Sequence, residues 1–589
     1  MDAPCFKNGA VNRLHMLVLA WLLLPLVVAG KDVVGYEVRF EGTLSKPLRT
    51  LLSEASLAVD LQRVGSVSPR ILRVRAEKDL ERFAAVLQSQ GHFGYHTAFD
   101  LVEDPAPARL VFQVISGAVY TIGSIQTSGL SDEPDLPSLG AAASTARLRA
   151  VGEFVLTGVK NLGYPWARLV DTRLEPDHGR HVLSVTCVIE PGPQANLGGI
   201  HLEGLKRVKH DHIESKIKLK PGERFRLSRL TELQKDIVDT GLFNSVQVGP
   251  GKGPDADGSA AVWVQLQELR YRTLFAGVSY EADRGVGGNA GFEHLNLFGR
   301  GEQVSTRLAI DDISLAWRNQ YSKPDFIRQR QTLSGKLDAL EESTDAFDSK
   351  TYTLGTGLSR PFGPRSRASL GVALEENQVE QEGVDRDFLL VLTPATFDRN
   401  TSGSLLDPRH GYAISLKAAP YWNLRSEDVF FFKTQVGARH YFPLREQPAL
   451  TLATRMVVGS LNGTTLENIP ANERFFAGGG GSVRGYRFQS VGPLSESNTP
   501  IGGMSLMEAS VELRATLVGA FGGVLFYDAA SVGTDAVPGR GASIQEAVGA
   551  GLRYQTPLGP IRADLGFPLD RRPDLDRAWQ FYLSLGQAF

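Results

Sequence analysis

The chain has 589 residues, of which 22% are charged, and its formal net charge is −2. A chain of this length exceeds what one ordinary hydrophobic core can organise, so we expect several domains. The near-neutral balance argues against a nucleic-acid-binding protein, which would carry a clustered basic excess. A mean hydropathy of −0.13 excludes a bundle of membrane helices. It is compatible with a transmembrane barrel, whose strands alternate between lipid-facing apolar residues and polar residues that face the interior.

The amino terminus predicts export from the cytoplasm. Lys7 and Arg13 precede an apolar run over residues 14–28, and two small residues follow it. This is the pattern of a secretory signal peptide covering residues 1–30. A retained membrane anchor is the alternative, although the run is shorter than the roughly 20 residues that a spanning helix needs. No later apolar run approaches that length, so a mature chain in a membrane is expected to cross it as a closed β-barrel.

Residues 31–269 contain three copies of one unit. Each copy opens with a strand that ends in glycine, continues with a helical pattern, and closes with a glycine–aromatic turn and a final strand. The repeat predicts α+β modules of order β-α-α-β-β at residues 31–117, 118–192 and 193–269. The clearest helical patterns cover residues 69–90, 148–162 and 227–240, and the final strands cover residues 108–114, 182–189 and 261–266. In the second copy the pattern for a first helix is weak, because the stretch is rich in alanine and serine.

The repeat is similar to polypeptide-transport-associated (POTRA) domains, which share this order of elements and the glycine–aromatic turn. A three-stranded sheet of this kind leaves strand edges exposed, and such an edge can accept an extended polypeptide by β-augmentation. The alternative is that the modules act as spacers that only set a distance.

From residue 270 onward, alternation of apolar and polar residues replaces the helical pattern. Turn signals such as residues 296–301 and 556–560 interrupt the alternation. About 320 residues, at roughly 20 per strand and connection, predict a transmembrane β-barrel of about 16 strands over residues 270–589. A large soluble β-sandwich is the competing interpretation, but it would not explain the signal peptide.

The last eleven residues, 579–589, alternate between two faces. Phe581, Leu583, Leu585 and Phe589 lie on one face, which is therefore apolar. A chain that stops on phenylalanine after such a strand resembles the carboxy-terminal β-signal of bacterial outer-membrane proteins. An ordinary closing strand is the alternative.

Residues 478–486 read Gly-Gly-Gly-Gly-Ser-Val-Arg-Gly-Tyr. Successive glycines suit backbone that passes through a crowded space better than a regular strand or helix. Arg484 requires a carboxylate, because its fixed donors suit bidentate pairing. The run Val483, Arg484, Gly485 and Tyr486 resembles the Val-Arg-Gly-Phe/Tyr signature of the BamA/TamA-type outer-membrane assembly-factor superfamily. In that family the signature lies at the tip of a long loop folded back into a β-barrel.

Strand alternation supplies acidic partners for this arginine. The neighbours of Asp528 on either side belong to an apolar face, so Asp528 is expected to face the lumen, since a carboxylate facing lipid is costly. Glu512 shares its face with polar residues in the same way. The resemblance implies that Arg484 reaches into the lumen and pairs with Asp528, with Glu512 nearby. We therefore predict that these three residues lock a loop over residues 461–489 inside the barrel, where two carboxylates compensate the enclosed guanidinium.

The resemblance also implies a function. It indicates an outer-membrane assembly factor that promotes insertion and secretion of β-barrel clients, such as autotransporters, without nucleotide. Client strands would pair at the POTRA edges and at a lateral seam between the first and last barrel strands. We expect the barrel in the bacterial outer membrane and the modules in the periplasm. The predicted seam residues are Leu274, Val278 and Tyr280 on the first strand, and Phe581, Leu583, Leu585 and Phe589 on the last.

Three amino-terminal modules match the TamA branch of the superfamily. That branch implies a TamB-like, inner-membrane-anchored periplasmic partner that docks on the first module, besides unfolded outer-membrane clients and the lipid bilayer. The alternatives are a two-partner secretion pore for a dedicated passenger protein, and a passive porin or adhesin. The sequence contains no phosphate-binding loop, no Gly-x-Ser-x-Gly elbow and no His-Glu-x-x-His motif, so we expect no enzymatic activity, no cofactor and no metal site.

Overall fold

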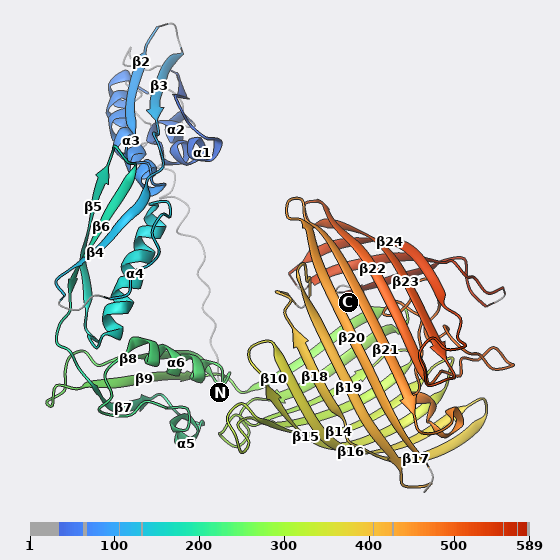
Figure 1. The fold of residues 1–589 in the computed structure, drawn as a ribbon. Coiled ribbons are helices and arrows are strands. Elements are labelled where there is room, and N and C mark those ends of the chain that lie inside the picture. The colour runs from blue at the N-terminus through green and yellow to red at the C-terminus, as the bar shows by residue number, and fades with distance from the viewer. Residues whose placement is uncertain are drawn as a thin grey trace, which may run out of the picture. The chain divides into compact units, whose positions relative to one another are not determined.

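The computed structural model describes residues 35–62, 67–104, 107–130, 134–404, 406–426, 429–557, 559–573 and 575–585. The predicted signal peptide and Phe589 lie outside these residues. The described chain forms three small sheets of three strands each and one sheet of 17 strands. Figure 1 shows the small sheets with their helices in blue to green, and the large sheet in light green to red.

The first module follows the predicted order of elements, with three helices where the repeat predicts two. β3 is its central strand, parallel to β1 and antiparallel to β2. Leu72, Phe83 and Phe112 are fully buried between the helices and the sheet, and the rings of Phe83 and Phe112 meet edge to face at a centroid distance of 4.8 Å. This apolar layer is the core of the module. Its elements are β1 (Tyr36–Glu41), α1 (Lys46–Ala55), α2 (Leu57–Gln62), α3 (Pro69–Ser89), β2 (His96–Val102) and β3 (Ala108–Ile115).

The second and third modules repeat this sheet. In both, the last strand along the chain is again the central one, in the orders β4-β6-β5 and β7-β9-β8. The second module contains β4 (Thr121–Ser128), α4 (Thr145–Asn161), β5 (Arg168–Asp177) and β6 (Val182–Glu190). The third contains β7 (Leu197–Glu203), α5 (His210–Glu214), α6 (Leu227–Val238), β8 (Phe243–Pro250) and β9 (Ala260–Glu268). The three helical patterns of the sequence thus correspond to α3, α4 and α6.

The second module departs from the predicted order, because α4 is the one helix among its described residues. Where the repeat predicts a first helix, Ala142 instead forms an isolated bridge with Thr121 at the start of β4. Pro134, Pro137 and Gly140 stand in this stretch. Proline removes a backbone donor, and glycine costs about 1 kcal/mol relative to alanine in a helix. These residues therefore disfavour a helix at the place where the pattern is weak.

The large sheet is a run of antiparallel neighbours in chain order, which confirms the all-β assignment of the carboxy-terminal half. Its strands are β10 (Arg272–Glu281), β11 (Gly285–His294), β12 (Gln303–Ile310), β13 (Ser314–Lys323), β14 (Thr332–Ser343), β15 (Asp348–Pro361), β16 (Ser366–Gln381), β17 (Val384–Leu392), β18 (Ala395–Asn400), β19 (Gly411–Asn423), β20 (Phe430–Arg445), β21 (Leu450–Asn462), β22 (Ser505–Val518), β23 (Phe521–Gly533), β24 (Gln545–Thr556), β25 (Gly559–Pro568) and β26 (Gln580–Leu585).

The count of 17 strands agrees with the predicted number of about 16. β17 and β18 both pair with β16 on one side and with β19 on the other. They occupy one strand position that is interrupted at Thr393 and Pro394. Proline has no backbone N–H to donate to the ladder, which explains the break.

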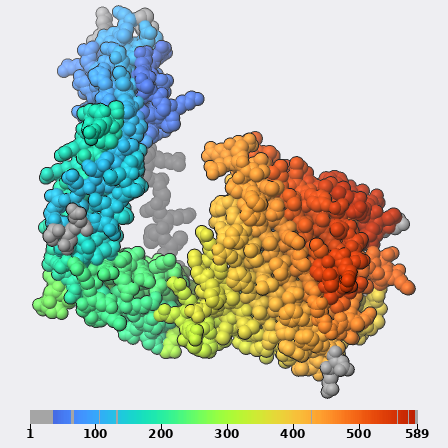
Figure 2. Space-filling view, viewed as in Figure 1, coloured from blue at the N-terminus to red at the C-terminus, as the bar shows by residue number. Residues whose placement is uncertain are grey.

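The two faces of the large sheet differ in polarity. Carboxylates and guanidinium groups are buried on the inner face, Asp528 and Arg553 among them. Figure 2 shows part of the outer face, in yellow to red, with side chains filling the gaps between the strands. An apolar outer face and a polar interior are the pattern of a transmembrane β-barrel. Large apolar side chains exposed on the outer face include Leu274, Leu354, Leu370, Leu525 and Leu552.

The helices of the described chain are all too short or too polar to cross a membrane.

The junction between β10 and β26, which we call the seam, is where the large sheet ends. The two strands lie side by side, with Cα atoms within 8 Å of one another. Among the described residues, however, no hydrogen-bonded ladder joins them. Over its described residues, each of the two strands therefore keeps one backbone edge without a strand partner.

Candidate functional site

The glycine–arginine stretch lies in the loop between β21 and β22, residues 463–504. This loop is longer than the predicted 461–489: it begins slightly later, because β21 extends to Asn462, but it continues much further, because β22 begins only at Ser505. Its regular structure is limited to two short 3-10 turns, η1 (Leu466–Asn468) and η2 (Ala471–Glu473).

The loop packs against the inner face of the large sheet. Val483 and Tyr486 of the loop are fully buried. They belong to one apolar cluster with Leu390 of β17 and Phe431 of β20, both of which point inward from the wall. Apolar burial of this kind holds the loop in the lumen without specifying its exact depth.

Arg484 sets that depth, because its side chain meets carboxylates at fixed positions on the strands. Its Nε and Nη2 donate to the two oxygens of Asp528 at 2.7 and 2.9 Å, which is a bidentate pair. Its Nη1 donates to Glu512 Oε1 at 2.6 Å and to Asp564 Oδ2 at 3.2 Å. The side chain of Arg484 is 2% exposed and those of the three acids are 0% exposed. The structure thus brings together the three residues that the sequence predicts, and adds Asp564.

Further donors balance the three carboxylates. Arg514 donates to Glu512 Oε2 at 2.7 Å, and Arg553 pairs with Asp564. Ser510 donates to Asp528 Oδ1 at 2.6 Å. Burying a carboxylate costs little stability only when its oxygen atoms accept hydrogen bonds from such donors. The network is therefore a compensated set of alternating charges, which we call the Arg484 site.

Glycines in the wall make room for the site. The guanidinium lies over the ring of Phe526, with Cζ 3.5 Å from the ring centroid. The ring in turn lies against Gly549, where an added Cβ would overlap it, and a Cβ at Gly551 would overlap the carboxylate of Asp564. Gly485 of the loop has a φ of 109°, a conformation that other residues rarely adopt.

The glycine tip touches both ends of the sheet. The Gly480 N–H donates to Asp283 Oδ2 at 2.5 Å, and Asp283 lies in the turn between β10 and β11. The Gly485 N–H donates to the hydroxyl of Tyr582 on β26 at 3.1 Å, and that hydroxyl donates to the Tyr486 carbonyl at 2.7 Å. The tip therefore connects the turn after β10 with β26, and the described residues of these two strands share no ladder.

A second set of contacts holds the other end of the loop. Glu473 in η2 pairs with Lys433 of β20 at 2.8 Å and accepts a hydrogen bond from Tyr421 at 3.1 Å. Asn472 donates to Asn377 of β16 at 2.7 Å. The sequence analysis missed these contacts and those of Asp283, because they join residues far apart in the chain. Alternation along β25 does place Asp564 inward, and that signal could have identified it.

The predicted seam residues lie on β10 and β26 with their side chains turned outward where the structure describes them. Leu274 and Val278 are 83% and 91% exposed. Phe581 is 51% exposed, whereas its neighbour Tyr582 is 3% exposed and points inward. The backbone of Leu585 pairs with Ile561 of β25.

Comparisons with known proteins agree with this architecture. The Omp85 superfamily domain matches residues 296–589, and a POTRA domain described as a surface antigen variable number repeat matches residues 195–268. The outer membrane protein assembly factor BamA of Neisseria meningitidis serogroup B is 23% identical over 95% of this chain and 79% of its own length. BamA of Nitratidesulfovibrio vulgaris is 24% identical over 72% of this chain and 55% of its own length.

A solved structure shows the same fold. BamA from Haemophilus ducreyi lacking POTRA domains 1–3 superposes with a TM-score of 0.67 at 18% identity, covering 79% of this chain and all of that one. The fold, the outward apolar face and both domain matches lead to one assignment. The chain belongs to the Omp85 superfamily, as an outer-membrane β-barrel protein with periplasmic POTRA modules ahead of the barrel.

Proposed function

We propose that this protein is an outer-membrane assembly factor that inserts or secretes β-barrel clients, autotransporters among them. The observation that carries the proposal is the seam, where β10 and β26 lie side by side and no ladder joins their described residues. Backbone N–H and C=O groups left unpaired in a bilayer cost several kcal/mol each, so an open edge favours a strand that completes it. A client strand that pairs there gains hydrogen bonds and buries its apolar face in lipid, and no nucleotide is needed.

In this proposal the loop controls the seam. Its tip donates one hydrogen bond to Asp283 beside β10 and exchanges two with Tyr582 of β26. Arg484 fixes the tip at that depth through Asp528, Glu512 and Asp564. Loss of the Arg484 site would free the tip and remove its bonds to both edges.

The modules deliver the clients. Each small sheet has its first two strands at the edges, and such edges can take up an extended segment by β-augmentation. The presence of three modules supports the TamA branch, with a TamB-like periplasmic partner on the first module. The names of the BamA relatives support the broader role in outer-membrane protein assembly.

A disulfide across the seam tests the proposal. Cysteine pairs would combine one of Ala276, Val278 or Tyr280 in β10 with Phe581 or Leu583 in β26. The matched control is Ala276→Cys with Ala290→Cys, which are register partners on β10 and β11 and leave the seam free. The measurement is insertion of an unfolded autotransporter barrel into liposomes that contain the purified protein.

We expect oxidised seam pairs to stop insertion and reductant to restore it, while the control stays active in both states. Continued insertion with a fully cross-linked seam would contradict the proposal. It would favour a pore that moves its passenger through the lumen, because such a pore does not need the seam to open.

A further inference from the structure

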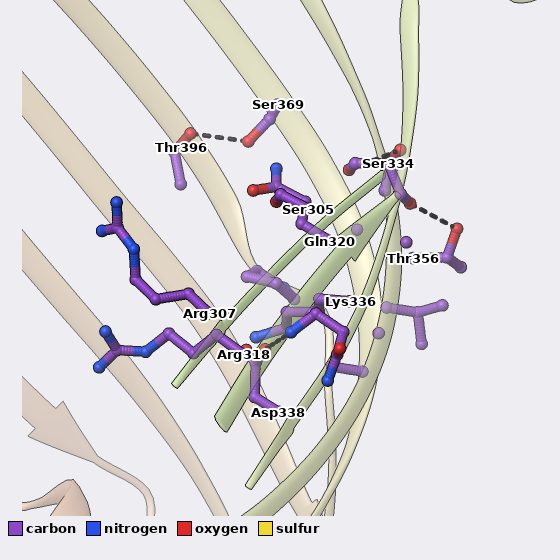
Figure 3. Close-up of a pocket in the computed structure, with 18 of the residues that line it drawn as sticks. Ser305, Arg307, Arg318, Gln320, Ser334, Lys336, Asp338, Thr356, Ser369 and Thr396 are labelled. Atoms are coloured by element: carbon purple, nitrogen blue, oxygen red, sulfur yellow. Dashed lines mark hydrogen bonds between the residues drawn. The ribbon is translucent and has the colours of Figure 1, made fainter. Parts of the chain in front are cut away.

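A hollow lined by several charged and polar side chains lies on the inner face of the large sheet, apart from the Arg484 site (Figure 3). It extends from β10 to β18 and has a volume of about 590 Å³. Its floor includes Gly355, Gly357 and Gly371, which leave the wall bare of side chains. A hollow of this size accommodates several side chains of a ligand.

Basic side chains line the hollow from three successive strands. Arg307 of β12 and Arg318 of β13 are register partners, and Lys336 of β14 lies beside them. Figure 3 shows the two arginine side chains running in the same direction from adjacent strands. Like charges directly opposite each other on neighbouring strands destabilise the pair unless an anion lies between them.

The acids of the hollow do not neutralise these cations. Asp338 and Glu293 line it too. Among the described residues, however, no carboxylate lies within 4.0 Å of the charged nitrogens of Arg307, Arg318 or Lys336. Asp338 Oδ1 instead accepts the backbone N–H of Asn319 at 3.3 Å. Arg307 lies over the ring of Phe275, with Cζ 4.9 Å from the centroid.

The hollow reaches the open edge of the sheet. Phe275, which lines it, belongs to β10, the strand whose outer edge has no ladder partner among the described residues. Arg307 is two strands further along, which is about 10 Å at the usual strand spacing. A segment held on the free edge of β10 is one strand further away, about 14 Å from Arg307, which an extended arginine and an extended acidic side chain span together.

We propose that this hollow binds a carboxylate of the polypeptide segment held at the β10 edge. The inference rests on the proposed function, since it needs a client strand at that edge. A guanidinium matches a carboxylate through two parallel hydrogen bonds, and two adjacent arginines can hold one between them. The hollow opens on the inner face, whereas Leu370 and Val372 of the same wall are exposed on the outer face. A polypeptide in the lumen is thus favoured over a lipid headgroup.

A peptide of residues 579–589 of this chain is a suitable probe. It contains no aspartate or glutamate, so its terminal carboxylate is its one acidic group. The full-length protein in detergent is titrated with the peptide, labelled at its amino end, as the free acid and as the carboxy-terminal amide. We expect the acid to bind about tenfold tighter, which corresponds to one charge-assisted pair.

Two variants assign the preference to the hollow. In the Arg307→Gln/Arg318→Gln double variant, both peptides should bind with the affinity of the amide, and Lys336→Gln alone should reduce the preference in part. Arg439→Gln is the matched control, because Arg439 is an exposed arginine of β20 that lines a different cavity. It should keep the full preference for the acid. Heat-modifiable gel mobility verifies that each barrel is folded.

Equal affinities of acid and amide for the unmodified chain would overturn the inference while leaving the proposed function standing. A preference that survives in the double variant would overturn it as well. Binding of neither peptide would contradict the proposed function itself. Titration in sodium phosphate at matched ionic strength is the second arm. The preference should persist there, and its loss would assign the hollow to free phosphate instead.

Discussion

In the first module, Leu52, Leu72, Phe83 and Phe112 are fully buried and pack helices onto a sheet. Around Arg484, by contrast, the fully buried side chains are a guanidinium and three carboxylates. Apolar contacts carry little direction, so the module core depends on volume and tolerates changes that preserve it. The Arg484 site depends on donor and acceptor geometry, and removing one partner leaves the others buried without a compensating charge.

The difference matters for function. A core of nonpolar side chains suits a module that stays folded while its sheet edges exchange partners. A charge network suits a loop whose tip must stay at one depth in the lumen. Breaking the network would release the whole tip at once. In the part of the first module that the structure describes, one carboxylate is buried, that of Asp79, and its charge is likewise met by hydrogen-bond donors. It accepts hydrogen bonds from Ser56 at 2.6 Å, from the Leu57 N–H at 2.8 Å and from the Ala58 N–H at 3.0 Å.

The largest effect is expected from Arg484→Met. It leaves Asp528, Glu512 and Asp564 buried without their shared partner, and breaking a buried ion pair costs about 3–5 kcal/mol. We expect the loop to become accessible to added protease, and assembly activity to be lost while the barrel stays folded. Limited proteolysis of the protein in liposomes measures this, with Arg439→Met as the control. A protected loop in the Arg484→Met variant would show that apolar packing alone retains it.

Leu72→Ala tests the apolar core of the first module, where packing volume and not charge is expected to determine stability. Deleting a fully buried leucine side chain leaves a cavity and lowers the free energy of unfolding by about 2–5 kcal/mol. The effect should stay within the first module and leave the protease protection of the loop unchanged. Ile71→Ala, at a position of α3 that is 48% exposed, should change stability little. Thermal unfolding followed by circular dichroism compares them, and equal effects would refute the assigned core.

Asp79→Asn tests whether the rule for buried charge holds inside the module. The amide keeps the shape, but it weakens three hydrogen bonds to a charged acceptor. We expect a loss of about 1–3 kcal/mol in the stability of the first module. Denaturant titration of the full chain measures it. A variant as stable as the parent would show that the charge contributes nothing there.

The smallest effect is a pH dependence in the third module. Glu268 of β9 accepts the backbone N–H groups of Lys206 and Val208 at 2.7 and 3.0 Å. Burial raises the pKa of Glu268, but the hydrogen bonds from Lys206, Val208 and Arg207 outweigh burial and hold the pKa below its usual value. The carboxylate therefore stabilises the fold above the unfolded-state pKa of about 4.3, and that contribution disappears as the pH falls through the folded pKa.

Glu268→Gln should accordingly lower stability at pH 7, and the difference from the parent should vanish at a pH below both pKa values. Thermal unfolding at the two pH values measures this. A difference that is the same at neutral and acidic pH would show that the charge of Glu268 is not responsible.

The sequence was informative wherever local periodicity decides the structure. Helical spacing predicts α3, α4 and α6, and strand alternation predicts that Asp528 and Glu512 face inward. Alternation also places Asp564 inward, but it cannot show which inward carboxylates lie at the depth of the loop tip. That depends on the stagger between β22, β23 and β25, which no single strand encodes.

Contacts made by turns were harder to predict. Asp283 lies in a turn between β10 and β11, 197 positions from the glycine whose N–H it accepts, and no periodicity links the two. The loop is longer than predicted because β22 begins only at Ser505, and Val491 and Met504 of the additional stretch pack into the apolar cluster in the lumen. In the second module, prolines and a glycine override the repeat where a first helix is predicted.

The central claim is that the loop tip lies inside the barrel, against the last strand. A cysteine pair tests it directly: Gly480→Cys with Tyr582→Cys. A Cβ at residue 480 would lie 3.4 Å from Tyr582 Cγ, which is within reach of a disulfide. The control is Gly480→Cys with Phe581→Cys, since Phe581 is on the same strand but faces outward.

We predict that the first pair forms a disulfide in native membranes under mild oxidation, and that the control pair does not. The disulfide is detected as a reductant-sensitive shift in gel mobility. Failure of the first pair to cross-link in folded protein, or equal cross-linking of both pairs, would contradict a loop tip held beside Tyr582 inside the barrel.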